Sequence, residues 1–342
     1  MIISFFLRNR GCRHRCIFCS ERVTGGEGAK DLTEDFFRET VEKHLRTGGE
    51  RNDTEIAFYG GNFLEMEDSL QSRLLRFAGP YVAGGQVRSV RVATRPDSIT
   101  GERLRFLSEN QVETIEIGAQ SLVDAVLENA RRGHTADDVR KAVRLSLAHG
   151  FRTGVHLMTG LPGERQEDFL RTVGEVEELR PHTVRVHPVL VFRNTALAEA
   201  FRSGTYVPLS LEEAAGRCSL AMERFERAGI SVIRVGLQET EALKEELIAG
   251  PHHPALRHVI ESARFLERAK RLLADLPPGT GGGKAVFRFS PADGSSFRGI
   301  RKENLKILQK LFPLLNIGVR EDEAMKRGSL SLALAAPGNE DA

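Results

Sequence analysis

Cysteine and tryptophan are scarce in this chain, whose 342 residues include four cysteines and no tryptophan. Four cysteines are too few for the disulfide framework of a small secreted protein. The apolar stretch at residues 2–7 is too short to span a bilayer, and Arg8 and Arg10 behind it do not fit a cleavable signal. We therefore expect a cytoplasmic protein with no membrane partner.

An excess of one charge is also missing, because 49 Lys and Arg face 47 Asp and Glu. This balance favours no class of partner for the chain as a whole. The segment 257–327 differs, since it holds 15 basic and 8 acidic residues. One interpretation is a solvated charged surface, and the other is an RNA-binding region in which Phe287, Phe289 and Phe297 offer stacking faces.

Strand-like runs alternate with amphipathic segments from the first residue onward, which is typical of parallel β-α units. The clearest helix is predicted at residues 135–149, with Thr135 as its N-cap and Gly150 as its C-terminal stop. The six predicted strands are residues 2–7, 55–59, 88–94, 112–117, 153–158 and 183–191. Parallel strands joined this way close into a full or partial barrel whose carboxyl ends share one rim.

The pattern changes after residue 191, and a Pro/Gly-rich stretch, residues 276–284, is the best candidate for a linker. We predict a core barrel at 1–238, a helical extension and linker at 239–283, a small α+β appendage at 284–336 and a flexible tail at 337–342. A further short strand is predicted at 232–235, in addition to the six strands of the β-α units.

Three of the four cysteines, Cys12, Cys16 and Cys19, lie in the loop that follows the first strand. A zinc site would usually need a fourth protein ligand, and His14 lies too close to its neighbours to supply one comfortably. A dithiol redox site is also disfavoured, because this CxxC does not open a helix after a thioredoxin-like strand. Three thiolates on a four-iron cluster leave one iron free to bind a substrate or cofactor.

The cysteine loop resembles that of the radical S-adenosylmethionine (SAM) superfamily. Further segments resemble the radical half of the Elongator catalytic subunit and its bacterial relatives, over about residues 2–238. They are FYGGNF (58–63), TRPDSI (94–99), IEIGAQSL (115–122), RRGHT (131–135), TGLPGE (159–164) and VHPVLVFRNTAL (186–197). The resemblance implies an α/β fold, a partial (β/α)6 barrel of the radical SAM type with a small C-terminal α+β appendage.

Two cofactors follow from the resemblance, a 4Fe-4S cluster on the three cysteines and SAM beside it. The residues implied for SAM are Phe18 at the adenine, Gly60, Gly61 and Asn62 at the methionine amino group, Gln120 at the ribose, Arg132 at the carboxylate and His156 near the adenosine. No other catalytic residue is assigned. Where many relatives have an acidic residue before TRPD this chain has Ala93, so we expect Thr94 or Ser121 to supply that contact.

The activity implied is that of a radical SAM enzyme, in which the reduced cluster cleaves SAM and a 5′-deoxyadenosyl radical takes a hydrogen atom from a substrate. An electron donor such as ferredoxin or flavodoxin is the expected partner, and an RNA or tRNA base is the substrate class that the resemblance favours. The sequence shows no counterpart of the Elongator acetyltransferase domain. Modification of a peptide or small metabolite, and a non-catalytic iron-sulfur RNA-binding protein, are the alternatives.

Overall fold

The computed structural model of the chain describes residues 1–24, 32–47, 54–277 and 283–335. It divides into two compact units, Met1–Pro254 and Ala255–Ala342. The finer boundaries proposed at residues 238, 283 and 336 stay predictions, and the predicted tail lies outside the described residues.

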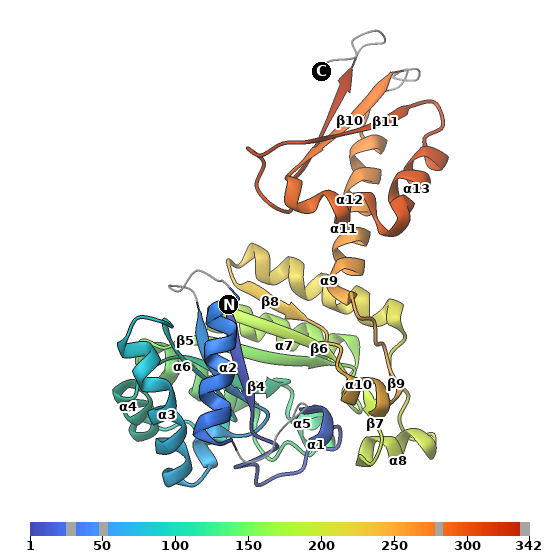
Figure 1. Ribbon diagram of the computed structural model, residues 1–342. Helices are drawn as coiled ribbons and strands as arrows, with labels where there is room; N and C mark the ends of the chain where they lie inside the picture. The colour runs from blue at the N-terminus through green and yellow to red at the C-terminus, as the bar shows by residue number, and fades with distance from the viewer. Residues whose placement is uncertain (25–31, 48–53, 278–282, 336–342) are drawn as a thin grey trace. The chain divides into compact units, whose positions relative to one another are not determined.

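A seven-stranded sheet forms the centre of the first unit, with neighbouring strands in the order β1-β2-β3-β4-β5-β6-β8 (Figure 1). Every neighbouring pair is parallel. The strands are β1 (Ile2–Phe6), β2 (Glu55–Tyr59), β3 (Ser89–Thr94), β4 (Val112–Gln120), β5 (Arg152–Thr159), β6 (Thr183–Pro188) and β8 (Ser231–Val235). The predicted α/β partial barrel is confirmed, and β8 adds a seventh strand to the six predicted ones.

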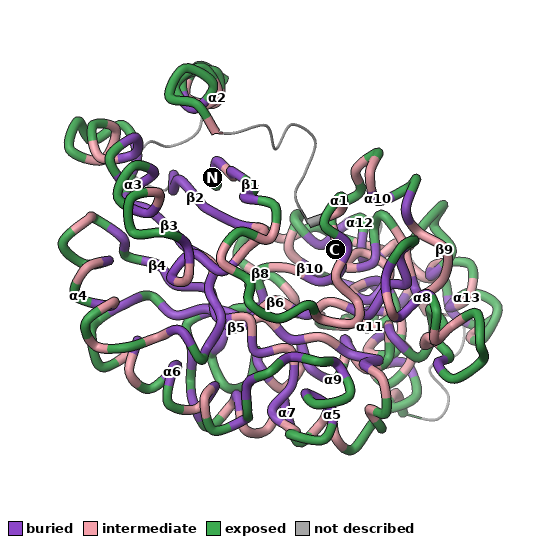
Figure 2. Tube along the Cα trace, turned by 90° about the horizontal axis from the view of Figure 1, so that it is seen from below, coloured by how far each residue is buried: buried purple, intermediate pink, exposed green. Residues whose placement is uncertain are grey.

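Helices cover the outside of this sheet, and the strands between them are largely buried (Figure 2). The helices of the first unit are α1 (Glu21–Thr24), α2 (Glu34–Arg46), α3 (Asp68–Ala83), α4 (Gly101–Glu109), α5 (Asp124–Asn129), α6 (Ala136–Ala148), α7 (Gln166–Leu179), α8 (Ala196–Arg202), α9 (Leu211–Arg227) and α10 (Glu241–Glu246). A small two-stranded sheet pairs β7 (Val191–Phe192) with β9 (Leu247–Ala249). Continuous burial along β2 is what a parallel sheet covered on both faces requires.

Local signals explain why α6 was predictable to within a residue at each end. Thr135 and Asp138 form a reciprocal capping box at its N-terminus. Gly150, just beyond the C-cap, has φ +81°, a conformation that glycine adopts without steric cost. The helix therefore begins and ends where its own sequence dictates.

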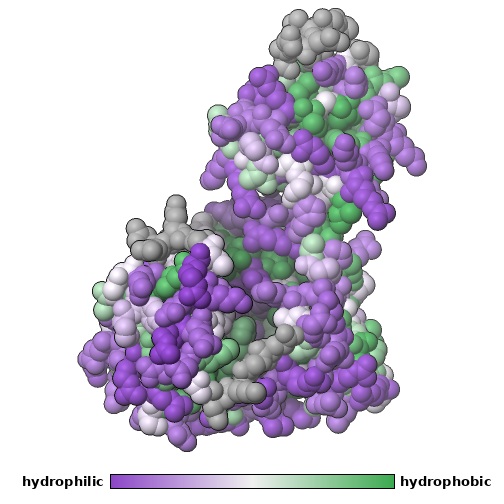
Figure 3. All heavy atoms as spheres, in the orientation of Figure 1, coloured by the Kyte–Doolittle hydropathy of each residue, from purple (hydrophilic) through white to green (hydrophobic). Residues whose placement is uncertain are grey.

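The second unit is a small α+β fold, as predicted. Its elements are α11 (Leu256–Ala274), β10 (Lys284–Phe289), α12 (Gly294–Arg298), α13 (Glu303–Leu311), β11 (Asn316–Glu321) and β12 (Leu330–Ala335). Strand β10 lies between β11, which is parallel to it, and β12, which is antiparallel. Figure 3 shows apolar residues gathered over these strands within a mostly hydrophilic surface.

The phenylalanines of the second unit form its core. Phe287, Phe289 and Phe297 are at most 1% exposed, and the rings of Phe289 and Phe297 stack with centroids 4.6 Å apart. Their proposed role as stacking faces for RNA bases is therefore wrong. In the part of the chain that the structure describes, no helix is both long and apolar enough to cross a membrane.

Candidate functional site

A cavity of about 1420 Å³ opens in the first unit beside the carboxyl ends of the sheet strands. Nine of the ten predicted site residues line it: Cys12, Cys16, Phe18, Cys19, Gly60, Gly61, Gln120, Arg132 and His156. Asn62 does not line it. Residues predicted from separate motifs along 145 residues of sequence thus share one cavity wall.

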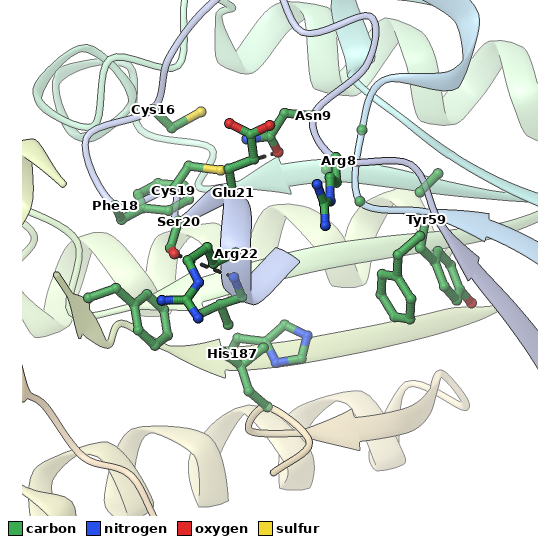
Figure 4. Close-up of a pocket in the computed structure, with 18 of the residues that line it drawn as sticks. Arg8, Asn9, Cys16, Phe18, Cys19, Ser20, Glu21, Arg22, Tyr59 and His187 are labelled. Atoms are coloured by element: carbon green, nitrogen blue, oxygen red, sulfur yellow. Dashed lines mark hydrogen bonds between the residues drawn. The ribbon is translucent and has the colours of Figure 1, made fainter. Parts of the chain in front are cut away.

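The cysteine loop leaves β1 through a turn of unusual backbone conformation. Arg8, Asn9 and Gly11 have φ values of +36°, +52° and +76°. The non-glycine residues among them store strain, which often marks functional sites. Figure 4 shows the Cys16 and Cys19 side chains on the cavity side of this loop.

Cys12 and Cys16 are free thiols, and Cys12 is exposed. The guanidinium of Arg132 donates to Cys16 Sγ over 3.0 Å, and Cys19 Sγ lies 3.6 Å from Asn9 Oδ1. Among the described residues no three Cys, His, Asp or Glu side chains are already gathered as a metal site. Three cysteine side chains on one short loop beside a cation could hold a four-iron cluster as thiolates if they converged on it.

The glycine pair Gly60-Gly61 packs directly against the cysteine loop. The backbone N–H of Asn9 donates to Gly60 O over 2.5 Å, and the backbone N–H of Asn62 donates to Arg10 O over 2.9 Å. A Cβ on Gly61 would lie 2.5 Å from Arg10 O, so no side chain fits there. The glycines therefore have a packing reason within the protein, in addition to the cofactor contact that the resemblance implies.

Asn62 is 1% exposed and joins the ends of two strands. Its side-chain Nδ2 donates to Ser98 Oγ over 2.8 Å. Its side-chain Oδ1 accepts from Thr94 Oγ1 over 2.6 Å and from the Arg95 backbone N–H over 3.1 Å. These bonds engage the side chain within the protein. Its assignment to the methionine amino group stays a prediction.

Gln120 and Arg132 reach the cavity from β4 and from the α5–α6 connection. Gln120 has φ +68° at a register shift between β4 and β5, an irregularity that re-aims a side chain. Arg132 is only 6% exposed and donates to Gly118 O over 2.5 Å. Its Nε is buried without a hydrogen-bond partner among the described residues, so Arg132 is no solvated surface cation and retains a donor for an anionic ligand.

Thr94 and Ser121, the residues expected to compensate for Ala93, both have hydroxyls engaged within the protein. The hydroxyl of Thr94 donates to Asn62, and Ser121 is fully buried outside the cavity lining. Ser121 Oγ lies 3.2 Å from Thr172 Oγ1 and accepts from the Val123 amide over 3.2 Å. Neither hydroxyl is free to replace an acidic side chain at position 93.

Sequence reasoning missed a buried charge network deeper in the barrel. Glu116 on β4 is 1% exposed and is contacted by Arg91, Arg185, His156 and the Tyr59 hydroxyl. Burial opposes ionisation of Glu116, but His156 and the two arginines outweigh it and hold its pKa well below the usual range. The sequence feature that could have revealed this network is a charged residue at the centre of each of several otherwise apolar strands.

Tyr59 and His187 stay uncharged near neutral pH within this network. Burial, together with Glu116, raises the pKa of Tyr59. Burial, together with His156 and the nearby arginines, lowers the pKa of His187 to about 3. The inner cavity wall therefore presents a fixed, internally bonded set of charges beside neutral donors.

Two consecutive family models match the chain. One, described as the Radical SAM superfamily, covers residues 7–176, and the other, the Radical_SAM C-terminal domain, covers residues 181–264. The chain belongs to the radical SAM superfamily. This membership agrees with the partial barrel and with the place of the three-cysteine loop after β1.

Similar proteins include the Elongator type, as the sequence predicted. The tRNA uridine(34) acetyltransferase of Methanocaldococcus jannaschii is 26% identical over 242 residues, covering 59% of this chain and 45% of the relative. Human Elongator complex protein 3 is 25% identical over 189 residues, covering 49% and 35%. This radical SAM protein thus spans less than half the length of these two relatives.

A solved structure of archaeal Methanocaldococcus infernus Elp3 with an N-terminal deletion has a TM-score of 0.58 and 21% identity, covering 69% of this chain and 59% of that one. At this identity the likeness shows the fold of the radical SAM core. It does not transfer the activity of the larger protein.

Proposed function

We propose that this radical SAM protein is an enzyme that holds a 4Fe-4S cluster on Cys12, Cys16 and Cys19 and binds SAM in the adjoining cavity. The cluster, when reduced, would supply the electron that cleaves SAM to methionine and a 5′-deoxyadenosyl radical, which takes a hydrogen atom from a substrate. The observation that carries the proposal is the single cavity wall shared by the three cysteines, the glycine pair, Gln120, Arg132 and His156.

The protein's own residues would position SAM rather than react with it. The buried Arg132 guanidinium would bind the methionine carboxylate through a charge-assisted hydrogen bond. The backbone at Gly60 and Gly61 lies open toward the cavity because neither residue carries a side chain. Phe18, which Figure 4 places beside Cys19 on the cavity wall, would cover the adenine ring.

The electron donor would approach the exposed side of the cysteine loop. Cys12 is exposed, and so are the neighbouring Arg13, His14 and Arg15. A positive surface next to the cluster suits an acidic one-electron carrier such as ferredoxin or flavodoxin, because opposite charges steer encounter.

Iron content tests the cluster assignment. Cys16→Ala should lose most of the iron bound by anaerobically reconstituted wild-type protein, whereas Cys218→Ala should keep it. Cys218 is a matched control, since it is buried in α9 and does not line the cavity. Equal iron loading in both variants would refute the assignment.

We further propose an RNA base as the substrate class. Support comes from the name of the M. jannaschii relative, a tRNA uridine acetyltransferase, and from a lysine stripe on the second unit. The stripe consists of Lys306 and Lys310, which lie one turn apart on α13, and of Lys302, the N-cap residue just before the helix. All three are exposed, and in the described parts of the chain none of them forms an ion pair.

Filter binding with total RNA over a salt series tests this substrate class. Replacing the three stripe lysines with Glu should weaken RNA binding. It should also reduce the slope of log affinity against log salt concentration, because about 0.7 to 0.9 counterions are released per neutralised phosphate. Lys270→Glu changes a single, partly exposed lysine that already pairs with Glu267, and it is the control for surface charge. If wild type retains no RNA even at low salt, the RNA proposal is refuted and a peptide or metabolite substrate is favoured.

A further inference from the structure

The inner wall of the cavity holds more guanidinium groups than carboxylates. The charge network at this wall contains two buried acids, Glu55 and Glu116, and three arginines, Arg91, Arg185 and Arg234. Glu116, Arg185 and Arg234 line the cavity, whereas Glu55 and Arg91 do not. Arg91 pairs with both acids, and Arg185 pairs with Glu116. Three guanidiniums against two carboxylates leave one positive charge, that of Arg234, without a paired anion among the described residues.

Arg234 lies beside Arg185 in the parallel register of β8 and β6. Its side chain is half-buried, lines the cavity and, within the described residues, makes no hydrogen bond or ion pair. Two neighbouring guanidiniums repel each other, and burial makes the repulsion stronger. Such an arrangement is costly unless an anion sits between the two groups.

Unused hydrogen-bonding atoms lie at the same place. Arg185 donates through its terminal nitrogen to Glu116 over 2.7 Å and to the Tyr59 hydroxyl over 2.8 Å, but its Nε is buried with no partner in the described structure. His187 Nδ1 is likewise buried and unpartnered there. Figure 4 shows the His187 ring directed into the cavity, with Arg8 directed inward from the end of β1.

Aromatic surface adjoins these donors. Phe6 and Phe36 line the cavity and are 44% and 48% exposed, whereas phenylalanine is usually buried. The ring of Phe6 lies 5.9 Å from that of Tyr59. The cavity therefore offers apolar surface next to a cationic group, as a molecule with a ring or chain and an anionic end would require.

We propose that Arg185, Arg234 and His187 form a subsite for an anionic group, a phosphate or a carboxylate, on the molecule that donates the hydrogen atom. The inference rests on the proposed function, since it assigns the substrate's position in the same cavity. Arg132, which contacts Cys16, would hold the SAM carboxylate, so the two anions would have separate cations. A guanidinium can donate two parallel N–H bonds to two oxygens of either anion.

Calorimetric titration of the anaerobically reconstituted full-length protein with inorganic phosphate, and separately with acetate, tests the subsite. Wild type should bind one equivalent of at least one probe, and Arg234→Gln should weaken that binding about tenfold or more. Arg152→Gln is the matched control, because Arg152 is exposed at the opposite end of β5 and does not line the cavity. Tighter binding of phosphate points to a nucleotide-like substrate, and tighter binding of acetate to a carboxylate substrate.

A second measurement separates the subsite from the SAM site. Saturating SAM should leave the affinity for the bound probe within about twofold, since SAM and the probe would use different cations. Competition between SAM and the probe would assign these arginines to SAM and overturn the proposal. Wild type that binds neither probe, or Arg234→Gln that binds as tightly as Arg152→Gln, would also overturn it.

The folded state of each variant is checked by the effect of the probe on thermal unfolding. The bound probe should raise the melting temperature of wild type and Arg152→Gln but not that of Arg234→Gln. Probe binding does not depend on SAM cleavage. A protein that binds the probe and never cleaves SAM would refute the proposed function alone, and one that cleaves SAM without binding either probe would refute the subsite alone.

Discussion

The buried network around Glu116 makes a strong prediction about stability. Glu116→Gln keeps the shape of the side chain but removes the charge that Arg91, Arg185 and His156 share. Among the described residues, Arg185 then has no carboxylate partner, and Arg91 retains Glu55 alone. Breaking a buried ion pair from one side costs about 3–5 kcal/mol of unfolding free energy.

The control lies on the same strand. Glu113 pairs with Arg88 over 3.0 Å, but its side chain is 51% exposed, so Glu113→Gln should cost less than about 1 kcal/mol. With a urea slope of about 3 kcal/mol per molar, Glu116→Gln should lower the unfolding midpoint by about 1 to 1.7 M and Glu113→Gln by about 0.3 M or less.

Tyrosine fluorescence is suited to this assay. The chain has no tryptophan, and its three tyrosines, Tyr59, Tyr81 and Tyr206, all lie in the first unit. The signal therefore reports the unit that contains Glu116. Equal midpoint shifts for the two variants would refute the view that the network stabilises the barrel.

The difference in unfolding free energy between wild type and Glu116→Gln should change with pH in a defined direction. The pKa of Glu116 is lower in the folded state than in the unfolded state, so its contribution is complete above the unfolded value of about 4.3. As the pH falls below that value, the stabilising contribution of wild-type Glu116 disappears. The gap between wild type and Glu116→Gln should therefore be full at pH 7 and shrink in acid.

Three further predictions concern the site and its surroundings. Gly61→Ala should lower iron loading, because a Cβ would lie 2.5 Å from Arg10 O. The control, Gly216→Ala at an exposed position of α9, should leave iron loading unchanged and raise the free energy of unfolding by about 0.5–1 kcal/mol. Iron analysis and urea unfolding of both variants check this. Arg132→Ala should weaken SAM binding about 5- to 150-fold by calorimetry, because the carboxylate loses its partner, and unchanged affinity would contradict that role. Burial and Arg132 lower the pKa of His134 to about 3, so the unfolded state alone takes up a proton below about pH 6.5. Stability should thus fall by about 2 kcal/mol from pH 7 to pH 5 through this group, and His134→Gln should remove that part of the slope in urea titrations.

Local signals in the sequence were enough to predict the six strands from β1 to β6, the helix α6 and the three-cysteine loop. Strand alternation, capping residues and motif spacing are all encoded within short segments. The pairing of β8 with β6 was not predictable in this way, because β7, α8 and α9 lie between them and interrupt the simple alternation of one strand with one helical segment. The short strand was itself predicted, but its sequence alone does not say which sheet it joins.

The same distinction applies to the site. A motif predicts which residues approach the cavity, as for Arg132, but not how a side chain divides its hydrogen bonds, as for Asn62. The Glu116 network is built from residues on five strands, so each charge taken alone resembled an exposed strand residue. Phe287 was misassigned for a related reason, since aromatic residues among cations fit a core as well as a stacking surface.

The most direct test of the central claim is product analysis after anaerobic reconstitution with iron and sulfide, addition of a strong reductant and incubation with SAM. Wild type should convert SAM to 5′-deoxyadenosine and methionine, and the triple variant Cys12→Ala, Cys16→Ala, Cys19→Ala should form neither above background. Turnover in the triple variant equal to that of wild type, or iron-loaded wild type that forms no 5′-deoxyadenosine, would contradict the account.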